Sequence, residues 1–306
     1  MWESIAREEF VGRLPGPCVL ITGGVHGDEF EPMAAARRLI DRFYENPPTR
    51  GRLVIAPVVN EPAFRLGSRV GEDQLDLARI CPGRCDGSIT ERIAHELSGL
   101  IRAADYYLDL HTGGTRMRIL PFVGYTLHTD ATVLKSQREM ARGLGLPIIW
   151  GTDPNLEGRS LSVARDAGIP AIYAEYQGGG GCDPAGVDAY FTGSLRVLAD
   201  LEMIDEPPAP PADTPLIVED SRAGSGHLQT NHPAPCEGFL ELAVSLGSTV
   251  REDDLLGVVS DPLGRRREPI RAQYAGIVLA LHTFSRIDAQ EIVAVILSTY
   301  ATSTLG

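Results

Sequence analysis

The stretch Cys18-Val-Leu-Ile-Thr-Gly-Gly-Val-His26-Gly-Asp-Glu29 has the strongest local structural signal in the chain. Its first five residues favour a buried strand, and the two glycines that follow indicate where this strand ends. From Pro32 to about Tyr44 the apolar residues recur at helical spacing. The segment is therefore expected to form a strand, a glycine-rich loop and a helix, and the loop carries a histidine and two acids.

The same alternation continues along the chain. Further runs of strand-forming residues lie at 52–59, 106–110 and 170–174. Helices are expected over 88–102, with Ser88 or Thr90 as the cap, and over 160–167. Strands that alternate with helices predict an α/β fold with a mixed, mostly parallel sheet flanked by helices.

A change of composition near residue 205 divides the chain. Residues 205–215 are acidic and rich in proline, which is typical of a semi-rigid linker. Beyond them only short strand-like runs separated by turns occur, and these predict a small all-β domain. We therefore expect a first domain over residues 1–204, a linker over 205–215 and a β domain over 216–306.

Charge and composition exclude several classes of partner. The 306 residues carry a formal net charge of −13, and a nucleic-acid partner is not expected because phosphate binding needs a concentrated basic surface. No apolar run reaches the roughly 18 residues that a membrane span needs. The N-terminal segment is acidic where a signal peptide is basic, so we expect no membrane partner and a cytoplasmic location. The five cysteines are expected to be free thiols.

Two histidines and one acid are candidate metal ligands. His26 and Glu29 are three residues apart on the loop after the first strand, and His111 follows the strand at 106–110. The carboxyl ends of neighbouring parallel strands meet at one edge of a sheet, where ligands gather. Two histidines and one carboxylate leave zinc an open position, as in catalytic sites. Asp109 is either a partner of His111 or a structural residue, and the sequence does not decide between these roles.

Three further charged residues are candidates for the same site. Glu175 ends a buried apolar strand and precedes four glycines, although a glutamate there can also point to solvent. Arg69 and Arg79 lie on the long loop after the second strand. Guanidinium groups bind carboxylates in a bidentate manner, but either arginine can equally be a solvated surface charge.

The combination resembles the succinylglutamate desuccinylase/aspartoacylase family, a branch of the zinc carboxypeptidase-like enzymes. The motifs that carry the resemblance occur in the family order: residues 26–29, 60–63, 76–83, 109–112 and Glu175 with its glycine run. The resemblance implies one Zn²⁺ per subunit held by His26, Glu29 and His111. It also implies that Glu175 is the general base and acid, that Arg69 polarises the scissile carbonyl and that Arg79 binds the substrate carboxylate. Family members usually have Asn before the second arginine, whereas this chain has Ala78.

This resemblance implies zinc-dependent hydrolysis of the amide bond of a small-molecule N-acyl amino acid. Two alternatives stay open: a carboxypeptidase that acts on short peptides, and a non-catalytic zinc- or ligand-binding protein.

The C-terminal segment resembles the barrel-sandwich modules of lipoyl carriers. Such carriers modify a lysine at a hairpin tip, and this segment has none, because Lys135 is the only lysine of the chain. We therefore expect the domain to shield the cleft or to form a subunit contact. A homo-oligomer is compatible with the second role.

Overall fold

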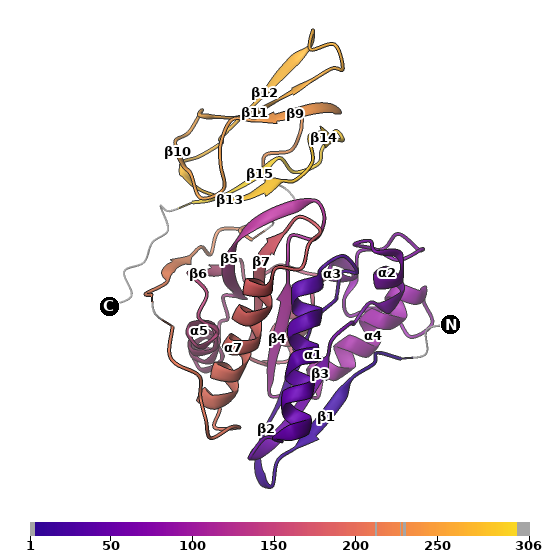
Figure 1. Ribbon diagram of the computed structural model, residues 1–306, viewed down its shortest axis with the longest axis vertical. Coiled ribbons are helices and arrows are strands. Elements are labelled where there is room, and N and C mark those ends of the chain that lie inside the picture. The colour runs from indigo at the N-terminus through magenta and orange to yellow at the C-terminus, as the bar shows by residue number, and fades with distance from the viewer. Residues whose placement is uncertain (1–3, 212, 227, 229–230, 299–306) are drawn as a thin grey trace.

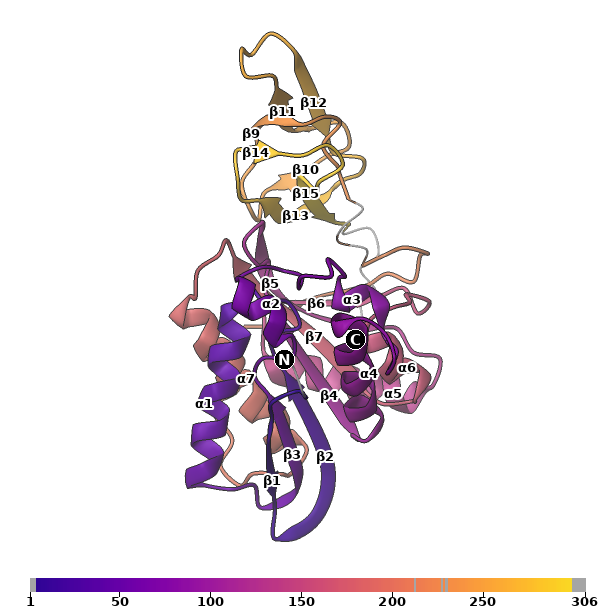
Figure 2. The same ribbon diagram turned by 90° about the vertical axis from the view of Figure 1, so that its right-hand side faces the viewer.

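The structure is a computed structural model that describes residues 4–211, 213–226, 228 and 231–298 (Figure 1). Within these residues no helix is long and apolar enough to cross a membrane. The α/β part forms the larger body, and the C-terminal strands β9 to β15 lie at one end of the molecule (Figures 1 and 2).

A large sheet runs through the molecule in the order β1-β3-β2-β4-β7-β5-β13-β10, with β6, β8 and β15 paired at its branches. Its strands are β1 (Glu8–Val11), β2 (Leu14–Thr22), β3 (Arg50–Ala56), β4 (Tyr106–His111), β5 (Met117–Thr126), β6 (Ile148–Thr152), β7 (Ala171–Gly178), β8 (Leu216–Glu219), β10 (Thr249–Val250), β13 (Gly276–His282) and β15 (Ala294–Leu297). The central pairs β3–β2, β2–β4 and β4–β7 are parallel, whereas β5 is antiparallel to β7. The predicted mixed, mostly parallel α/β fold is confirmed.

Helices cover both faces of this sheet. The helices are α1 (Phe30–Glu45), α2 (Glu61–Leu66), α3 (Leu77–Ile80), α4 (Ile89–Arg102), α5 (Ala131–Leu144), α6 (Ser160–Asp166) and α7 (Pro184–Asp200). One core joins α1, α5 and α7 to one face, and a second core joins α4 and α6 to the other. Along β2, Val19 and Ile21 enter the first core and Leu20 the second. Burial on both faces explains why this strand is a continuous apolar run.

The cap of α4 is Ser88, one of the two residues expected at this position. Ser88 is the residue before the helix, and its Oγ accepts a hydrogen bond from the backbone N–H of Glu91 at 3.4 Å. In return, the Glu91 carboxylate accepts the Ser88 backbone N–H at 2.8 Å. This reciprocal arrangement satisfies two backbone donors that the first turn of a helix leaves free.

The C-terminal segment is antiparallel β structure. Its second sheet has the order β12-β11-β9-β14, formed by β9 (Gly238–Leu242), β11 (Leu255–Ser260), β12 (Arg267–Arg271) and β14 (Arg286–Ile287). Below it, β13 pairs with β15 and also with β5 of the large sheet. The small β unit is therefore hydrogen-bonded to the α/β part through one continuous sheet.

The strand that follows the expected boundary at residue 216 pairs with the α/β part, and the boundary itself stays a proposal. Residues 216–219 form β8, which pairs in parallel with β6 and so belongs to the large sheet. Val218 is fully buried and packs in one cluster with Trp150 of β6. An edge strand leaves backbone N–H and C=O groups unpaired, and β8 satisfies those of β6. The remaining division into domains over 1–204, 205–215 and the later residues stays a proposal.

Candidate metal centre and active site

The loop after β2 and the end of β4 meet at the carboxyl edge of the sheet. The two strands are parallel neighbours, and Thr22 of β2 lies opposite Asp109 of β4. The backbone of the loop packs closely on α2, and this is possible because Gly27 has no side chain. A Cβ at Gly27 would lie 2.0 Å from the carbonyl carbon of Ala63. This packing places the side chains of the loop above the end of β4.

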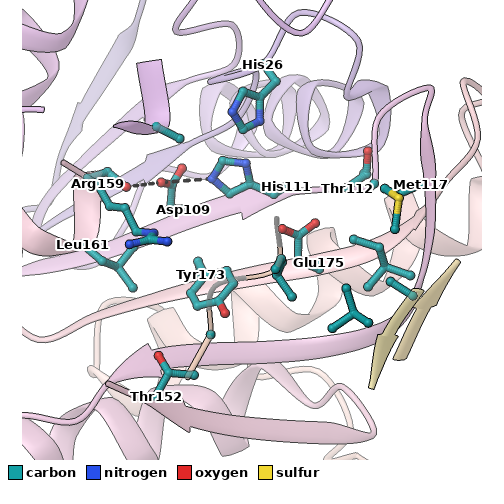
Figure 3. A pocket seen from close by; sticks show the side chains of 18 of the residues that line it. His26, Asp109, His111, Thr112, Met117, Thr152, Arg159, Leu161, Tyr173 and Glu175 are labelled. Atoms are coloured by element: carbon teal, nitrogen blue, oxygen red, sulfur yellow. Dashed lines mark hydrogen bonds and ion pairs between the residues drawn. The ribbon is translucent and has the colours of Figure 1, made fainter. Parts of the chain in front are cut away.

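Three of these side chains converge on one point. The Nδ1 of His26 lies 2.7 Å from one carboxylate oxygen of Glu29, and the Nδ1 of His111 lies 3.0 Å from the other. One ligand atom from each of the three residues lies within 4.8 Å of the others, and all three residues are buried. Figure 3 shows the two imidazole rings facing each other above the pocket.

The donor set fits a metal ion. The Nε2 atoms of both histidines face carboxylates: that of His26 lies 3.2 Å from Asp76 Oδ1, and that of His111 lies 3.2 Å from Asp109 Oδ2. Such carboxylates hold the proton on Nε2 and leave the Nδ1 lone pair for a metal. The Nδ1 lone pairs of His26 and His111 and the carboxylate of Glu29 then point at one another. This arrangement is stable when a cation lies between the three groups. Two nitrogens and one oxygen are also the donors that zinc prefers, with a position left open.

Asp109 is tied into the sheet as well as to His111. It is fully buried, accepts a hydrogen bond from Thr22 Oγ1 on one oxygen at 2.8 Å, and accepts one from Ser160 Oγ on the other at 2.5 Å. Burial alone raises the pKa of this carboxyl, but His111, Ser160 and Thr22 together lower it. Of the two roles left open by the sequence, the structure favours that of a partner for His111.

Glu175 faces the same point from the next strand. In the β4–β7 pair it lies opposite His111, and it is only 8 % exposed. Its Oε2 has no hydrogen-bond partner among the described residues. Burial raises the pKa of Glu175 to about 8, His111 opposes this shift and Glu29 adds to it. An unpartnered carboxylate oxygen beside a metal site is available to exchange a proton with a ligand.

Arg69 lines the pocket and is anchored by Asp76. Its Nε and Nη2 both donate to Asp76 Oδ2, at 3.1 and 3.0 Å. Its Nη1 lies 3.4 Å from His26 Nδ1 and 3.8 Å from Glu29. Burial raises the pKa of Asp76, but His26 and Arg69 lower it well below its ordinary value. Asp76 therefore stays ionised and fixes both a metal ligand and an arginine.

A pocket extends from this point and is lined both by the α/β part and by the C-terminal segment. Arg79, Arg159 and Tyr173 line one end of it. Burial lowers the pKa of Arg79 to about 10, and repulsion from Arg159 contributes, which indicates that the two guanidinium groups are close. Figure 3 shows Arg159 and Tyr173 on the opposite side of Glu175 from Met117. This end of the pocket is cationic.

The other end of the pocket is apolar. Residues Met117, Ile119, Leu228, Ala280, Ile292 and Val295 line it. Three of these belong to strands β13 and β15 or to the turn before β15, so the C-terminal segment forms part of the pocket wall. The expectation that this segment shields the cleft agrees with this placement.

The structure brings together all six site residues expected from the sequence. Five of them line the pocket, and Glu29 contacts both histidines. Sequence reasoning assigned no role to Asp76, Arg159 or Ser160. Asp76 lies in a quoted motif on the expected long loop, and the structure shows it before the short helix α3, where its side chain also accepts the backbone N–H of Ala78. Arg159 and Ser160 offered no signal beyond the expected start of a helix, because their partners are about 50 or more residues away.

Comparison with known proteins agrees with this fold and site. Residues 15–201 match the model of the family described as the succinylglutamate desuccinylase/aspartoacylase catalytic domain. The match covers more than half of the chain, and the chain belongs to this family. It is therefore a hydrolase of a deacylase family, with a His-Glu-His metal site.

Three relatives are similar to this chain over most of its length. The chain is 31 % identical over 298 residues to the N-alpha-acetyl-L-2,4-diaminobutyric acid deacetylase of Halomonas elongata. This match covers 94 % of this chain and 83 % of the relative. The product-bound structure of the ectoine utilization protein EutE (DoeB) from Ruegeria pomeroyi matches with a TM-score of 0.85 and 27 % identity, over 95 % of this chain and 88 % of that one. A succinylglutamate desuccinylase from Silicibacter sp. TM1040 matches with a TM-score of 0.83 and 26 % identity, over 95 % and 87 %.

Proposed function

We propose that this protein is a zinc-dependent deacylase that hydrolyses the amide bond of an N-acyl α-amino acid. The observation that carries the proposal is the convergence of His26, Glu29 and His111 beside Glu175, an acid with an unpartnered oxygen. One Zn²⁺ per subunit is the ion that this donor set supports best.

The cationic end of the pocket supports a substrate with a carboxylate. Arg79 and Arg159 both line this end, and guanidinium groups bind carboxylates in a bidentate manner. Two arginines also compensate for Ala78, which offers no side-chain hydrogen bond to a carboxylate. The relative from Halomonas elongata is named for an N-acetylated α-amino acid, and we propose a substrate of that class.

Each charged residue of the site has a separate role in the proposed reaction. When bound, zinc supplies a Lewis acid that polarises the amide carbonyl and lowers the pKa of water. Glu175 takes a proton from the attacking water and delivers it to the amine nitrogen as the C–N bond breaks. Arg69, held by Asp76, stabilises the negative charge that develops on the carbonyl oxygen. Arg79 and Arg159 hold the carboxylate and so fix the distance to the scissile amide.

A small substrate fits the pocket better than a peptide chain does. The strands β13 and β15 close the pocket at its apolar end, and β13 is hydrogen-bonded to β5. This closure favours a deacylase over the alternative of a carboxypeptidase. The cytoplasmic location and a homo-oligomer stay predictions.

The test combines metal analysis with a substrate panel. The purified protein is analysed for zinc and assayed with N-acetyl-L-2,4-diaminobutyrate, N-acetyl-L-aspartate, N-succinyl-L-glutamate and short peptides. We expect hydrolysis of at least one N-acyl amino acid, with loss on chelation and recovery on addition of zinc. Glu175→Gln should retain zinc and lose at least about 100-fold in kcat. Turnover near that of the wild type in this variant, or activity that chelators leave unchanged, would contradict the mechanism.

A further inference from the structure

We infer that the apolar end of the pocket is the acyl subsite and that it accepts a short, uncharged acyl group. The inference rests on the proposed function, because it assumes an N-acyl amino acid. It adds two points that the proposed function leaves open: at which end of the pocket the acyl group binds, and which acyl groups the pocket rejects.

The two ends of the pocket differ in charge, and the reacting groups lie between them. Figure 3 shows Glu175 and His111 in the middle, with Arg159 on one side and Met117 on the other. In an N-acyl amino acid the carboxylate is attached on the nitrogen side of the scissile bond, and the acyl group on the carbon side. A carboxylate bound by Arg79 and Arg159 therefore directs the acyl group toward Met117 and the C-terminal strands.

The wall at this end is a row of three side chains on adjacent strands. Ala280 of β13 lies opposite Ile119 of β5 on one side and opposite Val295 of β15 on the other. All three are buried and line the pocket. Side chains at matched register positions lie about 5 Å apart on the same face of a sheet. Ala280 is the smallest of the three, so the row has a notch at its centre.

This wall offers nothing to a charged acyl group. The side chains of this wall are those of Ile119, Ala280, Ile292 and Val295, and all four are uncharged. The terminal carboxylate of a succinyl group would lose its hydration against these side chains without gaining a partner, which is strongly unfavourable. The wall therefore selects acetyl and similar short acyl groups over succinyl.

Ile292 is the residue at which the wall can best be changed. It is only half-buried and lines the pocket, whereas Ala280 and Val295 are fully buried in the core. Truncation to alanine should enlarge the subsite at a smaller cost in stability. Ile277 of β13 is a matched control, because it is also a half-buried isoleucine of the C-terminal segment and is not among the residues that line the pocket.

The experiment measures binding rather than turnover. Zinc-loaded full-length protein carrying Glu175→Gln is titrated by calorimetry with N-acetyl, N-butyryl and N-succinyl derivatives of L-2,4-diaminobutyrate and of L-aspartate. We expect the N-acetyl compounds to bind at least about 30-fold more tightly than the N-succinyl compounds, with both amino acids. Ile292→Ala should shift the butyryl-to-acetyl affinity ratio about 10-fold toward butyryl, since two more methylene groups are accommodated. Ile277→Ala should leave this ratio unchanged.

The outcomes separate the subsite from the proposed function. Equal binding of succinyl and acetyl compounds, a ratio that Ile292→Ala does not move, or no binding at all would each overturn the acyl subsite. Binding with the expected acyl preference, combined with no hydrolysis by the zinc-loaded wild type, would support the subsite and count against the deacylase.

Discussion

Replacement of Ser160 by alanine should weaken metal binding although Ser160 contacts no metal ligand. Its hydroxyl donates to the buried Asp109 oxygen that faces His111. A hydrogen bond to a buried charged group contributes about 1.5–3 kcal/mol, and loss of such an outer partner typically costs 10–100-fold in metal affinity. Because Asp109 keeps the bond from Thr22, we place Ser160→Ala at the lower limit, about 10-fold. Adding Thr22→Val should bring the loss to about 100-fold.

The assay is a competition for zinc between the apoprotein and a chromophoric chelator, with unfolding of the apoprotein followed in parallel. Ser162→Ala is the control, because Ser162 is buried on the same helix but donates to the carbonyl of Leu156. It should lose stability to a similar degree and keep its zinc affinity. Ser160→Thr, which retains a hydroxyl, should recover part of the loss. An unchanged zinc affinity in Ser160→Ala, or an equal loss in Ser162→Ala, would refute the reasoning.

Two further predictions concern stability. Gly27→Ala should destabilise the fold by about 3 kcal/mol or more, since its Cβ would lie 2.0 Å from the backbone of α2. Gly99→Ala, at an open position of α4, should instead stabilise the fold by up to about 1 kcal/mol. Denaturant titration measures both changes, and equal effects of the two substitutions would contradict the packing argument. Glu219→Gln should cost about 1–2 kcal/mol at pH 7, because Arg138 binds Glu219 through two 2.7 Å hydrogen bonds. Burial raises the pKa of Glu219, but Arg138 and Tyr125 lower it below the ordinary 4.5, so this contribution is complete above that pH and is lost as the pH falls through the lowered pKa. A difference between variant and wild type that stays constant down to pH 3 would contradict this assignment.

The parts of the fold that could be predicted are those whose signal is local. Residues 18–29 contain a strand, its end and two metal-ligand candidates in one short stretch. Ser88 and Glu91 similarly satisfy each other within one helical turn. In these cases the interactions that determine the structure join residues close in sequence, and side-chain type and spacing therefore suffice.

The rest depends on contacts between distant segments. The run at 216–219 has the same composition as a strand of the small β unit, and only its pairing with β6 assigns it to the large sheet. Arg159 looks like an ordinary charged residue at the start of a helix, and its role follows from its position in a pocket formed by several elements. Tertiary packing decides such cases, and a single sequence contains no periodicity that reveals it.

Because β13 pairs with β5, we expect that the α/β part cannot be isolated by truncation. A fragment ending near residue 205 would expose the edge of β5 and the apolar side chains that Ala280 and Val295 cover, and such an edge is prone to aggregation. With the proposed acyl subsite, the same connection separates substrate preference from metal binding. Substitutions in the last strands can reshape the pocket while the metal ligands, on other strands, keep their positions.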